Sequence, residues 1–130
     1  MPVQIRFNDI DMFGHLNNTV YLQFLDMGKY AYFRQFMSDT FGSEPTAPVV
    51  VNINCNFLEP TKIDETLEVH TAITAIGDTS LTLDQRIVNT DGHIKCTART
   101  IMVNIDLATS QPTTVSSAWR EKIESYELSK

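Results

Sequence analysis

The sequence lacks several features that mark membrane, secreted or nucleic-acid-binding proteins. Its N-terminus has no apolar signal-peptide core, and no apolar run approaches the roughly 20 residues that a membrane-spanning helix needs. No run of Lys or Arg stands out, and the formal net charge is −6. Because nucleic-acid binding depends on clustered positive charge, no nucleic-acid partner is expected. We expect a cytoplasmic protein with no membrane partner.

Cysteine is scarce, and patterns that bind metals or phosphates are missing. The two cysteines, Cys55 and Cys96, lie in strand-like runs without a Cys-x-x-Cys spacing, so we expect two buried, reduced thiols. No cluster of His, Cys and Asp has the spacing of a zinc site, and there is no nucleophile elbow or glycine-rich phosphate loop. The sequence therefore predicts no metal site and no cofactor.

The length of 130 residues predicts one domain over residues 1–130, with a single core. Apolar residues alternate with polar ones over residues 2–8, which predicts a short strand. A long helix is expected from about Asn18 to Phe41, with Asn17 or Asn18 as N-cap and Gly42 as its stop. Gly28, inside this helix, indicates a close approach of helix and sheet, or room for a ligand.

Period-two patterns dominate the rest of the chain. From Val49 to Leu58 the odd positions are apolar and the even positions polar, which predicts a strand with one face in the core. Further strands are expected at residues 66–76, 79–90 and 93–105, followed by a short helix at 116–127. This order predicts an α+β fold, in which one face of the sheet packs on the helix. Unpaired sheet edges favour oligomerisation.

The stretch from Asp9 to Tyr21 contains the strongest candidate for a functional site. Carboxylates, a glycine, a histidine and two asparagines lie within it, immediately before or at the start of the long helix. The first turn of a helix presents unpaired backbone N–H groups. A carboxylate and a set of directed N–H donors are the minimum parts for hydrolysing an activated carbonyl compound.

Two motifs resemble those of a known family. The first is the run Asp9-x-Asp11-x-x-Gly14-His15-x-Asn17-Asn18-x-x-Tyr21, which resembles the signature of the 4-hydroxybenzoyl-CoA thioesterase family, within the hotdog-fold acyl-CoA thioesterases. The second is Phe57-Leu-Glu-Pro-Thr-Lys-Ile-Asp-Glu-Thr66, which matches that family's entry into its third strand. The resemblance implies a hotdog fold, an antiparallel sheet wrapped around one long central helix. It also implies a homodimer or homotetramer that hydrolyses acyl-CoA or acyl-carrier-protein thioesters without a metal.

The resemblance assigns the catalytic carboxylate to Asp11 and the carbonyl-polarising backbone N–H to about Asn18. Asp11 would act as general base or as nucleophile; the alternative is that it only caps the loop or the helix. His15 either positions water or the thioester, or is a hydrogen-bonded structural group. Asn17 either contacts the substrate or caps the helix. Two further residues, Gly14 and Tyr21, are assigned to the substrate-binding region, although Tyr21 also suits the core.

Two functions from different classes follow from this resemblance. The favoured one is an acyl-CoA thioesterase, which releases a free acid and CoA. The alternative is a non-catalytic hotdog module that binds acyl-CoA as a sensor or partner domain, and the intact Asp11 argues against it. A third hypothesis, a hotdog hydratase or dehydratase, lacks support, since those enzymes use a different arrangement of histidine and acidic residues.

Overall fold

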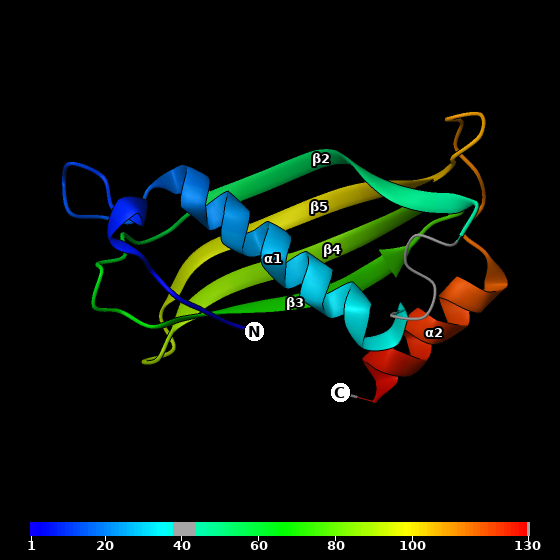
Figure 1. The fold of residues 1–130 in the computed structure, drawn as a ribbon. Helices are drawn as coiled ribbons and strands as arrows, with labels where there is room; N and C mark the ends of the chain where they lie inside the picture. The colour runs from blue at the N-terminus through cyan, green and yellow to red at the C-terminus, as the bar shows by residue number, and fades with distance from the viewer. Residues whose placement is uncertain (38–43, 130) are drawn as a thin grey trace. The chain divides into compact units, whose positions relative to one another are not determined.

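The computed structural model describes residues 1–37 and 44–129. Figure 1 labels its helices and strands. In chain order they are β1 (Pro2–Val3), a 3-10 helix η1 (Phe7–Asp9), α1 (Asn18–Met37), β2 (Thr46–Phe57), β3 (Leu67–Ile76), β4 (Ser80–Asn89), β5 (Ile94–Asp106) and α2 (Ser117–Leu128). The strand order in the sheet is β1-β3-β4-β5-β2. The predicted α+β class, the three later strands and the final helix are confirmed.

The described residues cluster into two compact units, to which α1 and the strands β2 to β5 each contribute. The first unit consists of Met1–Ala31, Cys55–Thr71 and Gln85–Ala98. The second unit consists of Tyr32–Asn54, Ala72–Asp84 and Arg99–Lys130. Each unit has its own hydrophobic core.

The core of the first unit is mainly aliphatic and lies between the first part of α1 and the sheet (Figure 1). Its helix side chains include Val20, Phe24 and Leu25, which recur at the spacing of one helix face. Gly28 allows close approach, because a Cβ at that position would lie 2.5 Å from Val69 Cγ1 of β3. The structural explanation of this glycine is therefore confirmed.

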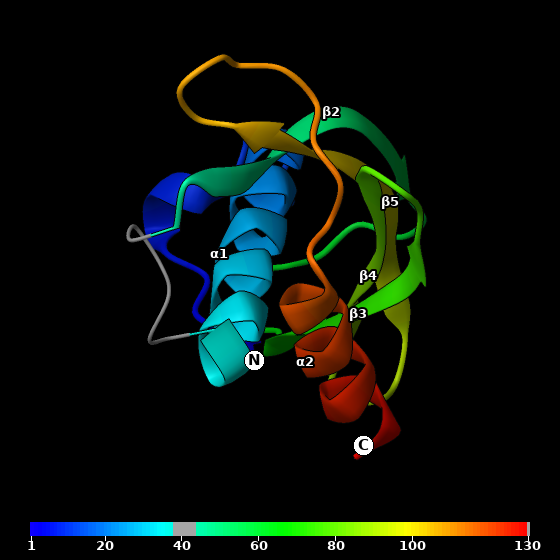
Figure 2. The same ribbon diagram turned by 90° about the vertical axis from the view of Figure 1, so that its right-hand side faces the viewer.

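The core of the second unit is rich in aromatic rings. Helix α2 lies beside the end of α1, as Figure 2 shows. Trp119 and Ile123 of α2 are buried, and Tyr126 packs against this core. Ser116 caps α2, because its Oγ accepts a hydrogen bond from Trp119 N at 3.2 Å. Helix α2 therefore begins at a capped N-terminus and packs one side against the second core.

Two strand predictions need correction. The strand expected over residues 2–8 is only Pro2–Val3, because hydrogen bonds between Arg6 and Asp9 turn the chain into η1. Strand β2 begins at Thr46, earlier than predicted. The predicted end of the long helix, near Phe41 and Gly42, lies outside the described residues.

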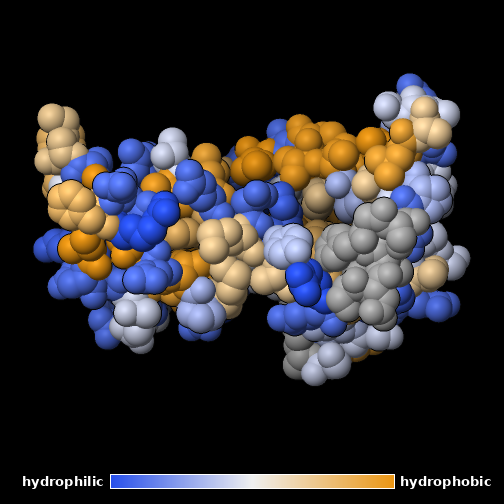
Figure 3. Space-filling view, in the orientation of Figure 1, coloured by the Kyte–Doolittle hydropathy of each residue, from blue (hydrophilic) through white to orange (hydrophobic). Residues whose placement is uncertain are grey.

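The prediction that β2 turns one face into the core is wrong for most of its length. The side chains of Val51 and Ile53 are 58% and 49% exposed. In the space-filling view, apolar residues gather along β2 (Figure 3). β2 is the last strand in the sheet order, with a neighbouring strand on one side only, and its side chains are largely uncovered on both faces.

Candidate active site

A tight loop brings the carboxylate of Asp11 into a defined position. Asp11 Oδ1 accepts hydrogen bonds from Phe13 N at 2.9 Å and from His15 N at 3.2 Å. The backbone closes the same loop, since Asp11 N donates to His15 O at 2.8 Å. The backbone φ at Gly14 is 80°, a left-handed conformation that residues other than glycine rarely adopt. The loop therefore occupies one carboxylate oxygen, and no described residue donates a hydrogen bond to Oδ2.

The start of α1 follows directly from this loop. Asn17 is the N-cap, because its Oδ1 accepts from Thr19 N at 3.1 Å and from Thr19 Oγ1 at 3.0 Å. This role occupies the side-chain oxygen that was also a candidate for substrate contact. Asn18 is the first residue of the helix, and within the described residues its backbone N–H has no acceptor.

Two backbone hydrogen bonds and one ion pair anchor the loop within the first unit. Asn17 N donates to Asp9 O at 2.8 Å, and Asp9 itself is buried in an ion pair with Arg6. The hydrogen bonds from Arg6 lower the pKa of Asp9, although burial opposes the shift. Leu16 N donates to Thr61 O at 2.7 Å. Asp9 thus holds the loop through its contacts with Arg6 and Asn17.

A cavity of about 210 Å³ opens beside the loop. Four of the six predicted site residues line it: Asp11, His15, Asn18 and Tyr21. The other two, Gly14 and Asn17, do not line it but shape the loop and the helix start. The rest of the wall consists of Leu16, which follows the Asp11 loop, and of the end of β2 with the residues after it: Phe57, Leu58, Glu59 and Pro60.

Tyr21 serves both the core and the cavity. Its side chain is buried, and the centroid of its ring lies 5.5 Å from the centroid of the Phe57 ring. Its hydroxyl lies 2.7 Å from Thr61 Oγ1 and donates to Glu59 O at 3.3 Å. Burial raises the pKa of Tyr21. The phenol is therefore a neutral, hydrogen-bonded part of the wall and not a candidate base.

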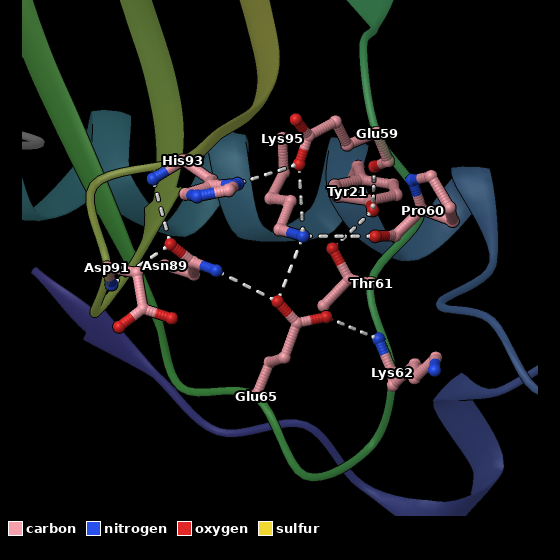
Figure 4. Close-up of polar contacts among 10 residues, drawn as sticks. All are labelled: Tyr21, Glu59, Pro60, Thr61, Lys62, Glu65, Asn89, Asp91, His93 and Lys95. Carbon is pink, nitrogen blue, oxygen red and sulfur yellow. Dashed lines mark hydrogen bonds and ion pairs between the residues drawn. The ribbon is translucent and has the colours of Figure 1, made fainter.

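The sequence reading missed a second carboxylate in the wall, Glu59, and the charges behind it. Glu59 Oε2 lies 3.3 Å from His93 Nδ1 and 3.4 Å from Lys95 Nζ. Lys95 also contacts Glu65 Oε1 at 2.9 Å (Figure 4). Glu59 and Lys95 are distant in sequence, and a lone lysine in a strand gives no signal of a buried ion pair.

The described residues contain no group of three or more His, Cys, Asp and Glu side chains placed to hold a metal ion. Cys55 and Cys96 are both free thiols, with their sulfurs 3.3 Å apart. Cys96 is buried as predicted, whereas Cys55 is half-buried. No helix in the described part of the chain is both long and apolar enough to cross a membrane.

Comparison with known proteins decides the family. The model of the thioesterase-like superfamily matches residues 5–123. The chain belongs to this superfamily. The chain is 29% identical to the long-chain acyl-CoA thioesterase FadM of Escherichia coli K12 over 126 residues, which are 94% of each chain. It is 28% identical to the acyl-CoA thioester hydrolase YbgC of E. coli O6:H1 over 113 residues, covering 85% of this chain and 84% of YbgC.

The fold agrees with that of solved thioesterases. A thioesterase from Thermus thermophilus, solved with coenzyme A and zinc, is similar with a TM-score of 0.85 and 24% identity. The alignment covers 98% of this chain and 92% of that one. The expected hotdog fold and the resemblance to hotdog thioesterases are therefore confirmed.

Proposed function

We propose that this protein is an acyl-CoA thioesterase that uses the cavity beside Asp11 as its active site. Its relatives FadM and YbgC are named as a long-chain acyl-CoA thioesterase and an acyl-CoA thioester hydrolase. The observation that supports the site most is the shared lining: Asp11, which carries a carboxylate, and Asn18, the first residue of a helix, border one cavity in the first unit. This is the pairing that hydrolysis of an activated carbonyl compound requires.

Asp11 supplies the carboxylate for one of two routes. As general base, Oδ2 takes a proton from water while the water oxygen attacks the thioester carbonyl; the C–S bond then breaks, and the CoA thiolate receives the proton. As nucleophile, Oδ2 attacks the carbonyl carbon and displaces the thiolate, which leaves a mixed anhydride that water hydrolyses. Both routes need the oxygen to which no described residue donates a hydrogen bond.

The Asn18 N–H is the proposed donor to the carbonyl oxygen as negative charge develops there. It lies at the positive end of the α1 dipole, which favours an oxyanion. His15 also lines the cavity, and we assign it the orientation of water or thioester rather than proton transfer. Asn17 and Gly14 act indirectly, by fixing the helix start and the turn.

The thiol part of the substrate is proposed to be CoA or an acyl carrier protein. The coenzyme A bound in the similar T. thermophilus thioesterase supports CoA. We propose a homodimer, or a homotetramer built from it, with the exposed apolar row of β2 in the interface. Val51 and Ile53 favour this, because an exposed, apolar edge strand is a site for pairing with another chain.

The test is release of free thiol from short, medium, long and aromatic acyl-CoAs by wild type and by Asp11→Asn. The amide keeps an oxygen for the Phe13 and His15 N–H groups, so the fold should persist. We expect kcat to fall by at least about 100-fold. The matched control is Asp106→Asn, because Asp106 Oδ1 accepts from Ala108 N and Thr109 N in a similar loop of the second unit; it should keep wild-type turnover.

Two results would overturn this proposal in different ways. Wild-type turnover by Asp11→Asn would remove Asp11 from the mechanism. Acyl-CoA binding without thiol release by the wild type would favour the non-catalytic module. In a single turnover in ¹⁸O-labelled water, ¹⁸O in the Asp11 carboxyl group would identify the anhydride route, since only that route can place it there.

A further inference from the structure

Lys95 of β5 is a buried cation beside the wall of the cavity. Its side chain is only 7% exposed. Burial of an ammonium group is costly unless it is paired and hydrogen-bonded. Figure 4 shows how its Nζ is satisfied: it lies 2.9 Å from Glu65 Oε1 and 3.4 Å from Glu59 Oε2, and it donates to Pro60 O at 3.1 Å. Two of these partners, Glu59 and Pro60, line the cavity.

The wall segment Glu59–Thr61 is also held from its other side. The Tyr21 hydroxyl contacts Thr61 Oγ1 and Glu59 O, as described above. Thr61 is fully buried, and its carbonyl accepts the hydrogen bond from Leu16 N. Leu16 directly follows His15, so this bond joins the wall segment to the loop that carries Asp11.

Glu65 is a fixed counterion and not a mobile surface group. Its Oε2 accepts from Lys62 N at 2.8 Å, and its Oε1 accepts from Asn89 Nδ2 at 3.0 Å. Burial opposes ionisation of Glu65, but these hydrogen bonds and Lys95 outweigh it and lower its pKa to about 2. Burial likewise opposes a charge on Lys95, and Glu65 and Glu59 raise its pKa. Lys95 and Glu65 are therefore both charged at neutral pH.

We propose that Lys95, held by Glu65, is a positioning residue of the thioester site: it fixes the segment Glu59–Thr61, and through the Thr61–Leu16 hydrogen bond it sets the position of the Asp11 loop. The catalytic part of this inference rests on the proposed function. Lys95 itself does not line the cavity. It would affect turnover by changing the position of the wall residues that it contacts. Small displacements of a catalytic group lower turnover strongly.

A stabilising ion pair alone would behave differently from a positioning device. Removal of one partner leaves the other charge buried, which destabilises the fold in either case. Removal of both charges should recover much of the lost stability, because the orphaned charge is gone. The double variant still lacks the Lys95 ammonium group, however, which donates to Pro60 O and pairs with Glu59. Stability and positioning are therefore separable in the double variant.

The experiment compares Lys95→Met, Glu65→Gln, the double variant and wild type by urea unfolding, acyl-CoA kinetics and hydrogen exchange at the Leu16 amide. Arg99→Met is the matched control, because Arg99 lies on the same strand but pairs with Asp84 at the surface. In the double variant we expect recovered stability, kcat reduced roughly tenfold with KM little changed, and Leu16 exchange roughly tenfold faster. The control should match wild type in all three measurements.

Each part of the proposal has a result that overturns it. If the double variant regains wild-type kcat together with its stability, the pair is a stability device only. If Leu16 exchanges as slowly as in wild type, the link through Thr61 is wrong. If wild type hydrolyses none of the acyl-CoAs, the proposed function fails, and the Leu16 exchange still decides whether Lys95 positions the loop.

Discussion

The two units are built from the same helix and largely the same strands, yet they bury different chemistry. The first unit buries two charged residues, Asp9 and Lys95, next to the residues of the cavity. The second unit buries no charged residue among those described, and its core contains Tyr32, Phe33 and Trp119. Polar groups are costly to bury unless they are paired. We therefore expect substitutions in the aromatic core of the second unit to act on stability, and substitutions near the buried, paired charges of the first unit to act on turnover as well.

The largest effect on stability is expected from the aromatic core of the second unit. Trp119→Ala should lower the free energy of unfolding by about 3–5 kcal/mol, because it removes a large buried ring that packs near Phe33. Urea unfolding measures this loss. Turnover per folded molecule should stay near wild type. A strong loss of kcat in folded protein would break the division of roles between the units.

The buried ion pair of the first unit should make the protein sensitive to acid. The pKa of Glu65 is lowered from 4.5 to about 2, so its contribution is present above pH 4.5 and is lost as the pH falls towards 2. Glu65→Gln should remove on the order of 2–3 kcal/mol of this pH dependence. Unfolding curves between pH 2 and pH 6 measure it. An unchanged slope in the variant would contradict the assignment.

The close approach of helix and sheet in the first unit predicts an unfavourable Gly28→Ala substitution. Alanine usually favours a helix by about 1 kcal/mol over glycine. Here the new Cβ would lie 2.5 Å from Val69 Cγ1, so we expect a net loss of about 1–2 kcal/mol. Val69→Ala in the same chain should restore part of that loss. A double-mutant cycle measures the coupling, and zero coupling would exclude this contact as the cause.

The smallest effect is expected from the exposed ion pair on β5. Arg99 Nε lies 2.8 Å from Asp84 Oδ1, but the Arg99 side chain is 64% exposed. Water and salt screen such a pair. Arg99→Met should therefore leave the urea midpoint nearly unchanged, whereas Lys95→Met should lower it clearly. Equal losses in the two variants would show that burial does not distinguish these pairs.

Much of the site was predictable because its contacts are local. The Asp11 loop closes on Phe13 and His15, and Asn17 caps the helix through Thr19, two residues away. Short-range hydrogen bonds of this kind depend on residue type and spacing, which a sequence displays directly. The strands with period-two patterns were predictable for the same reason.

The parts that could not be predicted depend on long-range contacts. Tyr21 and Thr61 are 40 residues apart, and Lys95 and Glu59 are 36 apart. No local pattern tells which strand lies beside which loop, so Glu59 was not identified as part of the wall. The apolar row of β2 was assigned to the core for the same reason, since its position at the sheet edge is a property of topology.

By itself, the sequence determined most of the elements, the Asp11 loop and the start of the long helix, because each follows from residues within a few positions of one another. The tertiary structure decided which side chains face the cavity, that Lys95 is buried against two glutamates, and that β2 remains exposed. These features arise only when segments distant in sequence come together, since burial and charge pairing are properties of neighbours in space.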